Sequence, residues 1–459
     1  MNKQASFRVP IKFVRRGFTG HDVPEDGIMQ KCVRCGLCLP TCPTYLETLR
    51  ETSSPRGRIH LMEAVAAGKL DLTDPGFVGQ MYQCLDCRAC EAVCPSGVEY
   101  GKLVEAARTQ IERAMPGSTV KRGLRWLVFH QIFGNMRVFR LLCRLLLFYQ
   151  RSGLQRLVRK CGILSILRLK EAEELLPTFP KSFLSYSGEQ YGAESLVSTK
   201  NASPSTSVLP VAGKTATQVA LFAGCIMSTA FAETDRATIR VLLAAGCSVV
   251  VPRHQGCCGA LTVHAGDMDR ARVMARRNID AFEQSGAEYI IVNAAGCGAA
   301  LKDYGHLMRD DNLYAERAAH FSTQVRDITE FLASRSFSSP QHPLHLRITY
   351  QEPCHLVHAQ RIDRAPRELL HSIPGIELIE MRESSLCCGS AGIYNITQPE
   401  MSRRLQERKI KQIQKSGADL VVTSNPGCYL QLQSGLRQAG STMRVVHIVD
   451  LLDMAYRQE

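Results

Sequence analysis

The sequence predicts an α+β protein of several domains: a helical N-terminal domain with two cysteine motifs, a basic helical segment, and two tandem α/β repeats with parallel sheets. Two observations support this fold class. The two N-terminal motifs share one cysteine spacing, and the C-terminal half contains two copies of one pattern of strands, helices and cysteines. The 459 residues are enough for about three domains.

Six segments are expected along the chain. They are a basic leader (1–22), the domain of the two cysteine motifs (23–115), a basic amphipathic helical segment (116–195), a linker rich in Ser, Thr and Pro (196–216), the first repeat (217–335) and the second repeat (336–459).

The motifs of the N-terminal domain both read C-x₂-C-x₂-C-x₃-C-P. At this spacing three thiolates hold three corners of a cubane [4Fe–4S] cluster, and the fourth cysteine ligates the other cluster. One cluster is therefore assigned to Cys32, Cys35, Cys38 and Cys94, and the other to Cys84, Cys87, Cys90 and Cys42. The alternative is zinc, but structural zinc sites use four ligands, usually as two separated pairs. The spacing thus predicts a ferredoxin-like domain whose two clusters lie close enough to pass electrons.

The C-terminal repeat has an offset of about 130 residues. The matched cysteines are Cys225 with Cys354, Cys257 and Cys258 with Cys387 and Cys388, and Cys297 with Cys428. Runs such as QVALFAGC and RITYQEPC are typical of strands that end at a cysteine, and charged periodic stretches between them predict helices. Strands that alternate with helices form parallel sheets, whose sites lie beyond the carboxyl ends of the strands. Four thiols are therefore expected to converge in each repeat.

Each repeat contains the sequence Cys-Cys-Gly, which we call the CCG motif. The two sets of four thiols could hold a third and a fourth cluster. Two alternatives stay open: only one set binds a cluster, or the thiols are simply buried. Nearby histidines are expected to be packed or solvated rather than ligands; these are His254, His264, His306, His355 and His358.

The nineteen cysteines are expected to be free thiols or metal ligands, in a protein that resides in a reducing compartment. The basic N-terminus lacks the apolar h-region of a signal peptide, and no uncharged apolar run reaches the length of a membrane span. A cytoplasmic protein without a transmembrane span is therefore expected.

The net charge of +13 comes from one segment. Thirteen Lys and Arg and no Asp or Glu lie between Arg113 and Lys170, so no nucleic-acid partner is indicated. These residues form either solvated faces that pack on the other domains, or a surface that lies on an anionic membrane or docks a partner. The second interpretation places the protein peripherally on the cytoplasmic face of the inner membrane, where a quinone could accept its electrons.

No G-x-G-x-x-G or G-x-x-x-x-G-K-[ST] sequence occurs in the chain. Clusters of this type carry single electrons, whereas a hydride needs an organic cofactor. If the chain serves a dehydrogenation, the flavin is expected on another subunit.

Over nearly its whole length the chain resembles the iron–sulfur subunits of flavin-linked dehydrogenases. The resemblance is strongest to the glycolate oxidase (glycolate dehydrogenase) type. The stretches that carry the resemblance, besides the two motifs, are Ser54–Ile59, Cys94–Val98, Gly256–Ala260, Gly296–Ala299, Leu386–Gly392, Lys302–Gly305 and His358–Gln360. The wider group includes subunits of anaerobic glycerol-3-phosphate dehydrogenase, lactate-utilisation proteins and heterodisulfide reductase. Heterodisulfide-reductase-type domains add a further cysteine after the last one, and neither repeat has it.

The resemblance implies an electron-transfer subunit in a complex with FAD-binding subunits. Those subunits would oxidise glycolate to glyoxylate, or D-lactate to pyruvate, and this chain would pass the electrons to a quinone or similar acceptor. One alternative is the equivalent subunit of a lactate or glycerol-3-phosphate dehydrogenase. Another is an autonomous reductase with its chemistry at the CCG motifs, and a third is a non-catalytic iron–sulfur regulator.

Overall fold

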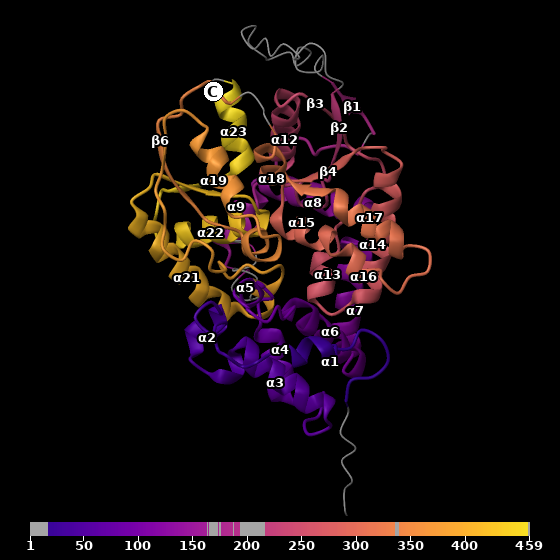
Figure 1. Ribbon diagram of the computed structural model, residues 1–459. Coiled ribbons are helices and arrows are strands. Elements are labelled where there is room, and N and C mark those ends of the chain that lie inside the picture. The colour runs from indigo at the N-terminus through magenta and orange to yellow at the C-terminus, as the bar shows by residue number, and fades with distance from the viewer. Residues whose placement is uncertain are drawn as a thin grey trace, which may run out of the picture.

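The computed structural model describes residues 17–162, 164, 173, 176–186, 188–192, 216–335 and 339–457. The helical N-terminal domain lies below the two α/β repeats, which stand side by side (Figure 1). The segment expected as a leader is described from Gly17 onwards, and there Thr19 N donates to Gln110 Oε1 at 3.0 Å. The segment expected as a linker lies outside the described residues except for Ala216.

The N-terminal domain is built from short helices around one apolar core. Its elements are α1 (Asp26–Gln30), α2 (Pro43–Thr48), η1 (Glu51–Ser53), α3 (Pro55–Ala66), α4 (Pro75–Gln83), α5 (Ala89–Ala92) and α6 (Tyr100–Ala114). The sequence sets the helix starts: Ser54 caps α3 and Asp74 caps α4, each followed by a proline at the first helical position. Met62, Phe77 and Leu103 fill the core without exposed surface.

The basic segment forms helices that pack behind the first repeat. Its elements are α7 (Thr119–Trp126), the π-helical turn η2 (Leu127–Ile132), α8 (Met136–Arg151) and α9 (Leu154–Lys160). One face of α8 buries Met136, Phe139 and Cys143 in the core of the first repeat. Among the described residues, no helix is both long and apolar enough to span a bilayer.

The two repeats form two sheets with matching strand order. The first repeat contains β2 (Thr217–Leu221), α12 (Ala232–Ala244), β3 (Cys247–Val250), α13 (Ala260–His264), α14 (Met268–Glu283), β4 (Tyr289–Val292), α15 (Ala295–Lys302), α16 (Tyr304–Leu307), α17 (Ala315–Gln324), β5 (Val325–Asp327) and α18 (Ile328–Ala333). The second contains β6 (Leu346–Tyr350), the π-helical turn η4 (His355–Ala359), α19 (Arg364–His371), β7 (Ile376–Leu378), α20 (Tyr394–Thr397), α21 (Pro399–Ser416), β8 (Leu420–Thr423), α22 (Pro426–Gln438), β9 (Arg444–His447) and α23 (Ile448–Arg457).

The strand orders are β3-β2-β4-β5 and β7-β6-β8-β9, all parallel. Val219 of the central β2 is paired with Val249 and Tyr289 on either side. The parallel sheets confirm the fold class expected from the sequence. The first sheet also has an edge strand that the sequence did not predict, β1 (Gln190–Tyr191), which runs antiparallel to β3.

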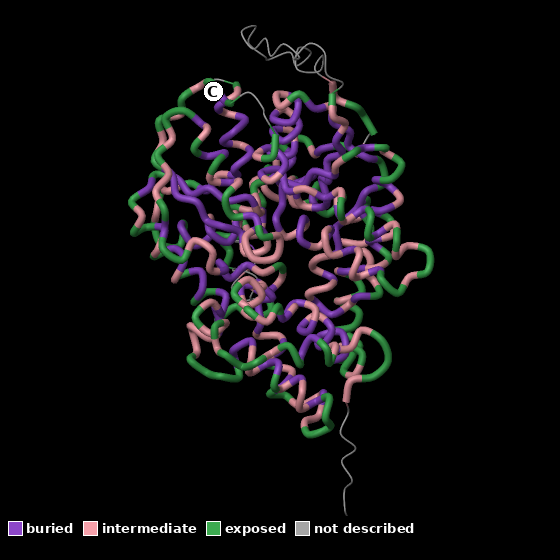
Figure 2. The backbone as a smooth tube through the Cα atoms, viewed as in Figure 1, coloured by how far each residue is buried: buried purple, intermediate pink, exposed green. Residues whose placement is uncertain are grey.

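The repeats exchange their final helices. Helix α18 of the first repeat packs on α19 of the second, and α23 of the second packs on α12 of the first. The ion pair between Arg240 Nη2 and Asp453 Oδ2, at 2.6 Å, ties α12 to α23. One apolar core therefore runs through both repeats, and Figure 2 shows this buried region along the sheets and the helices between them.

Candidate iron–sulfur sites

The second cysteine motif and Cys42 surround one buried cavity. It is lined by Cys42, Cys84, Cys87 and Cys90, the four cysteines predicted to share a cluster. Burial raises the pKa of the Cys84, Cys87 and Cys90 thiols, and the neighbouring thiols raise those of Cys87 and Cys90 further. Four thiols around one cavity are a donor set that suits a [4Fe–4S] cluster.

A buried arginine lies on the same cavity. Arg58 is 1% exposed, and its Nη2 donates to Thr44 Oγ1 at 3.0 Å. Burial disfavours its charge, but the nearby Cys84, Tyr100 and Cys42 raise its pKa, so the guanidinium stays charged beside the thiols. Arg58 is not among the site residues predicted from the sequence, although it lies in the Ser54–Ile59 stretch that carries the family resemblance.

The first motif lies nearer the surface. Cys35 is exposed, whereas Cys32, Cys38 and Cys94 are half-buried. Burial raises the pKa of Cys38, and the charges of Cys32 and Cys42 add to that effect, which places these thiols near one another. Cys94 lies against the same helical core as Cys32, and its Sγ accepts a hydrogen bond from Val98 N at 3.4 Å. The assignment of all eight cysteines to the two clusters stays a prediction.

The CCG thiols lie at the carboxyl ends of three adjacent strands in each sheet. In the first repeat Cys225 follows β2, Cys257 and Cys258 follow β3, and Cys297 lies on α15 just after β4. The second repeat places Cys354, Cys387, Cys388 and Cys428 in the same way after β6, β7 and β8. The Sγ atoms of Cys225 and Cys257 are 3.8 Å apart, and those of Cys354 and Cys387 are 3.9 Å apart.

The crowded thiols perturb one another in both repeats. Hydrogen bonds from Cys225 and Cys258 lower the pKa of Cys257, while the same contacts raise the pKa of both donors. In the second repeat the pKa of Cys388 is lowered by its contacts with Cys387 and Cys428. The four thiols of each repeat therefore interact directly with one another, and thiolates are the form that binds metal.

The second motif also touches the second repeat. Cys87 and Cys387 belong to one buried cluster against which Cys354 packs, and the charge of Cys354 raises the pKa of Cys87. Tyr394 of α20 donates its hydroxyl to Gln83 O at 2.8 Å across the same junction. The cavity of the second motif thus adjoins the CCG thiols of the second repeat.

A larger cavity separates the N-terminal domain from the first repeat. Its lining includes Cys258 of the CCG motif, Arg88 of the second motif, and Glu105, His264 and His355. Burial and the nearby His264 lower the pKa of His355 to about 4. His264 and His355 are expected from the sequence to be packed or solvated, and Glu105 is not among the predicted site residues, because residues so far apart in the chain give no local signal.

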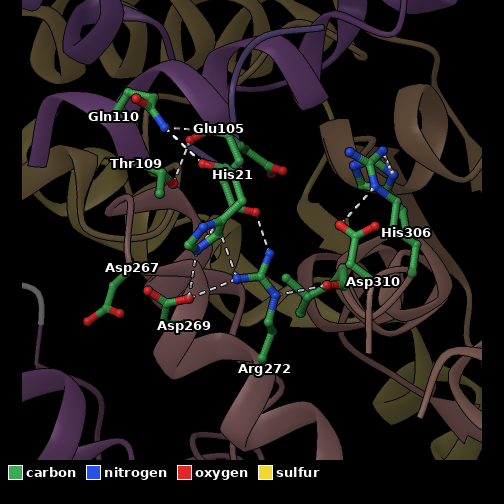
Figure 3. A network of polar contacts seen from close by, with 12 residues as sticks. His21, Glu105, Thr109, Gln110, Asp267, Asp269, Arg272, His306 and Asp310 are labelled. Carbon is green, nitrogen blue, oxygen red and sulfur yellow. Dashed lines mark hydrogen bonds and ion pairs between the residues drawn. The ribbon is translucent and has the colours of Figure 1, made fainter. Parts of the chain in front are cut away.

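Asp22 and Arg272, which line this cavity, take part in a network of ion pairs. Arg272 of α14 pairs with Asp22 and with Asp269, whose Oδ1 lies 2.9 Å from Nη1, and His21 lies beside them (Figure 3). Arg113 of α6 bonds to Asp22 at 2.8 Å. These contacts hold the segment before α1 against α6 and α14.

Three family profiles match the chain. The profile described as "4Fe-4S dicluster domain" matches residues 28–98, "Glycolate oxidase iron-sulfur subunit, linker region" matches 120–176, and "Cysteine-rich domain" matches 219–302 and 348–433. Together with the thiol geometry, these matches define an iron–sulfur protein of the electron-transfer class.

Comparison with individual proteins narrows the class. The chain is 42% identical to the probable glycolate oxidase iron-sulfur subunit of Bacillus subtilis (strain 168), over 93% of this chain and 94% of the relative. It is 33% identical to the glycolate oxidase iron-sulfur subunit of Escherichia coli (strain K12), over 95% and 96%. It is 28% identical to one of the subunits of the fumarate reductase (CoM/CoB) of Methanothermobacter marburgensis, over 95% of this chain and 74% of the relative. The chain belongs to the family of glycolate oxidase iron–sulfur subunits.

Proposed function

We propose that this chain carries electrons within a flavin-dependent glycolate dehydrogenase, from partner FAD subunits to a quinone or similar acceptor. The partner subunits would oxidise glycolate to glyoxylate, with D-lactate as a second candidate donor. The observation that carries the proposal is the series of three thiol sets: the first motif with its exposed Cys35, the buried cavity of the second motif, and the CCG thiols of the second repeat beside it.

We propose the ligand sets given above for two [4Fe–4S] clusters, which supply one-electron transfer when bound. The protein contributes burial and charge. Arg58 lies beside the second set, and Lys409, which is 1% exposed, lies beside the CCG thiols of the second repeat. Fixed positive charges in a buried site stabilise an anionic group without the cost of reorienting water.

The first motif is the candidate contact with the flavoprotein. Cys35 is exposed, and the neighbouring Val33 and Leu37 are 69% and 54% exposed. Apolar side chains that stay exposed around a redox group suit a protein partner. We therefore propose that electrons enter at the first motif and move inward to the second.

The basic segment is the candidate contact with a membrane. Leu141, Leu145 and Phe148 form an exposed stripe on α8, opposite the face that packs on the first repeat, and each is more than half exposed. We call these three residues the α8 stripe. Arg137, Arg144 and Arg151 on the same helix are exposed as well. An apolar stripe flanked by arginines suits the surface of an anionic bilayer. This supports a peripheral position on the cytoplasmic face of the membrane, where a quinone is within reach.

The proposal is tested by anaerobic purification of the tagged chain from its own host. The eluate is assayed for FAD and for dye reduction driven by glycolate, D-lactate, L-lactate and glycerol-3-phosphate. Bound flavin with glycolate-dependent activity is the expected result, and reduction of the clusters by glycolate is followed by EPR. A Cys35→Ser variant should keep the flavin but lose electron delivery to the dye.

Other outcomes select the alternatives. Flavin with activity on L-lactate or glycerol-3-phosphate alone would assign the chain to one of those dehydrogenases. Iron-loaded protein without flavin and without any of these activities would overturn the subunit proposal in favour of an independent reductase at the CCG motifs.

A further inference from the structure

Three ligand-type side chains meet where the N-terminal domain touches the first repeat. Asp86 comes from the loop of the second cysteine motif, Glu105 from α6 and His264 from the end of α13. One ligand atom of each lies within 4.8 Å of the others. His264 Nδ1 is 3.0 Å from Asp86 Oδ2 and 4.0 Å from Glu105 Oε1. We call these residues the Asp–Glu–His triad.

The backbone conformation between Cys84 and Cys87 directs the side chain of Asp86 toward Glu105 and His264. Asp86 has a positive φ of 54°, a conformation that Asp adopts more readily than most residues. Arg34 occupies the same position of the first motif with φ 57°, but it points to the surface and pairs with Glu63 at 2.7 Å. Asp86 is 2% exposed instead, and its Oδ1 has no hydrogen-bond partner. A buried carboxylate oxygen without a partner is costly, so a bound group at this oxygen would remove that cost.

In the described part of the chain, no Lys or Arg side chain pairs directly with either carboxylate, although His264 and the more distant Arg108 favour the charged form of Asp86. Among the described residues, neither Asp86 nor Glu105 has a Lys or Arg nitrogen within 4.0 Å. Two nearby arginines make their direct contacts with other groups: Arg88 pairs with Glu91 and Asp303, and Arg108 donates to carbonyl oxygens that include Met81 O and His264 O. Two carboxylates that face each other require either a shared proton or a cation between them.

We propose that the Asp–Glu–His triad binds one divalent transition-metal ion of the Mn²⁺ and Fe²⁺ class. Two carboxylates and one imidazole are hard and borderline ligands, which suit these ions, whereas the CCG thiols suit softer ones. Glu105 and His264 line the large cavity, whereas Asp86 lines the neighbouring cavity of the second motif, so the remaining coordination positions of the ion would face the large cavity on the side of Glu105 and His264. The ion would also join the loop of the second motif to the first repeat.

The other cluster of ligand-type residues does not share these features. His21, Asp22 and Asp269 also lie close together, but His21 is 70% and Asp269 is 66% exposed on the side chain. Arg113 and Arg272 already pair with both carboxylates. The two arginines already neutralise the carboxylates of Asp22 and Asp269, so no metal ion is needed there. This cluster therefore serves as a control.

The test is Mn²⁺ binding to the full-length, cluster-loaded chain under anaerobic conditions, followed by the EPR signal of free Mn²⁺. Mn²⁺ is the probe because thiols compete for it weakly. One Mn²⁺ per chain is expected, with affinity lowered about tenfold or more in His264→Gln and in Glu105→Gln. His306→Gln, which alters the same cavity outside the triad, and Asp269→Asn should bind Mn²⁺ like the unaltered chain.

A second readout separates ligand loss from misfolding. Mn²⁺ should raise the unfolding temperature of the unaltered chain and of His306→Gln, but not of Glu105→Gln, while all of them keep the same iron content. The proposal is overturned if Mn²⁺ does not bind, if binding survives both triad variants, or if Asp269→Asn abolishes it. Each of these results leaves the electron-transfer proposal intact, because that rests on cluster content and glycolate-driven reduction.

Discussion

Asn278 of α14 and Lys409 of α21 occupy the same position of the two repeats, and only the second carries a charge. Both side chains are buried. Asn278 connects its helix to the CCG motif of the first repeat, and Lys409 connects its helix to the loop before the CCG motif of the second. Asn278 Nδ2 donates to Cys257 O at 3.0 Å, and Lys409 Nζ donates to Ser384 O at 3.0 Å. The two thiol sets follow equivalent strands but lie in different electrostatic environments.

Lys409→Gln should lower the reduction potential of a cluster in the second repeat. A unit charge a few ångströms away in a partly screened site contributes about 2 kcal/mol to a one-electron couple, which is on the order of 100 mV. EPR-monitored potentiometry measures this shift. Lys415→Gln, on the same helix but exposed, is the matched control. An unchanged potential in Lys409→Gln, or the absence of a cluster signal from the second repeat, would contradict the prediction.

Cys35→Ser and Cys87→Ser should each remove one cluster, with different structural effects. Cys35 is exposed, so its loss should lower the iron content and leave the fold stable. Cys87 is packed against the second repeat, so its loss should also expose the junction to proteolysis. Iron analysis and limited proteolysis measure the two effects. Cys161→Ser, at an exposed thiol outside all the motifs, serves as the control, and equal iron content in all three variants would refute the ligand assignment.

Gly57→Ala should destabilise the N-terminal domain and displace Arg58. An added Cβ at Gly57 would lie 2.0 Å from Glu51 O, which is backbone and cannot move aside cheaply. Overpacking of this kind costs about 1–3 kcal/mol. Thermal unfolding and iron content measure the effect. Gly79→Ala, in helix α4 with nothing near the new Cβ, should be neutral or stabilising by up to about 1 kcal/mol. If the two variants unfold alike, the steric argument at Gly57 fails.

Leu145→Glu combined with Phe148→Glu should abolish binding to anionic vesicles. The two changes remove apolar area from the α8 stripe and place negative charges beside Arg144 and Arg151. Co-sedimentation with vesicles that contain anionic lipid measures binding, which should weaken as salt rises. Val273→Glu, at an apolar residue of α14 that is 46% exposed, is the control. Vesicle binding that persists in the double variant would assign the α8 stripe to a protein partner instead.

Local patterns predicted most of the fold. The parallel sheets and the two repeats followed from apolar runs that end at cysteines, because strand spacing and helix periodicity are properties of short segments. The strand-end rule also led to the expectation that Cys225, Cys257, Cys258 and Cys297 converge, and the structure places them after adjacent strands.

Contacts between distant segments could not be predicted in this way. Asp86 and His264 are separated by 178 residues, and the sequence around one of them does not indicate a contact with the other. The sequence shows that Lys409 is charged and Asn278 is not. The effect of this difference on the nearby thiols depends on the burial of both residues, which the sequence does not show. The edge strand β1 has only two residues, too few to show a strand period.

The exchange of final helices sets an order of events during synthesis. Helix α12 of the first repeat is covered by α23, which leaves the ribosome only after the whole second sheet has been made. At usual elongation rates the delay between α12 and α23 spans about two hundred residues, or about 10–40 seconds. During that interval the nascent first repeat has an uncovered apolar helix and no finished junction beneath it. The contacts of the second motif with Cys387 and Tyr394 therefore form only after the second repeat has been translated.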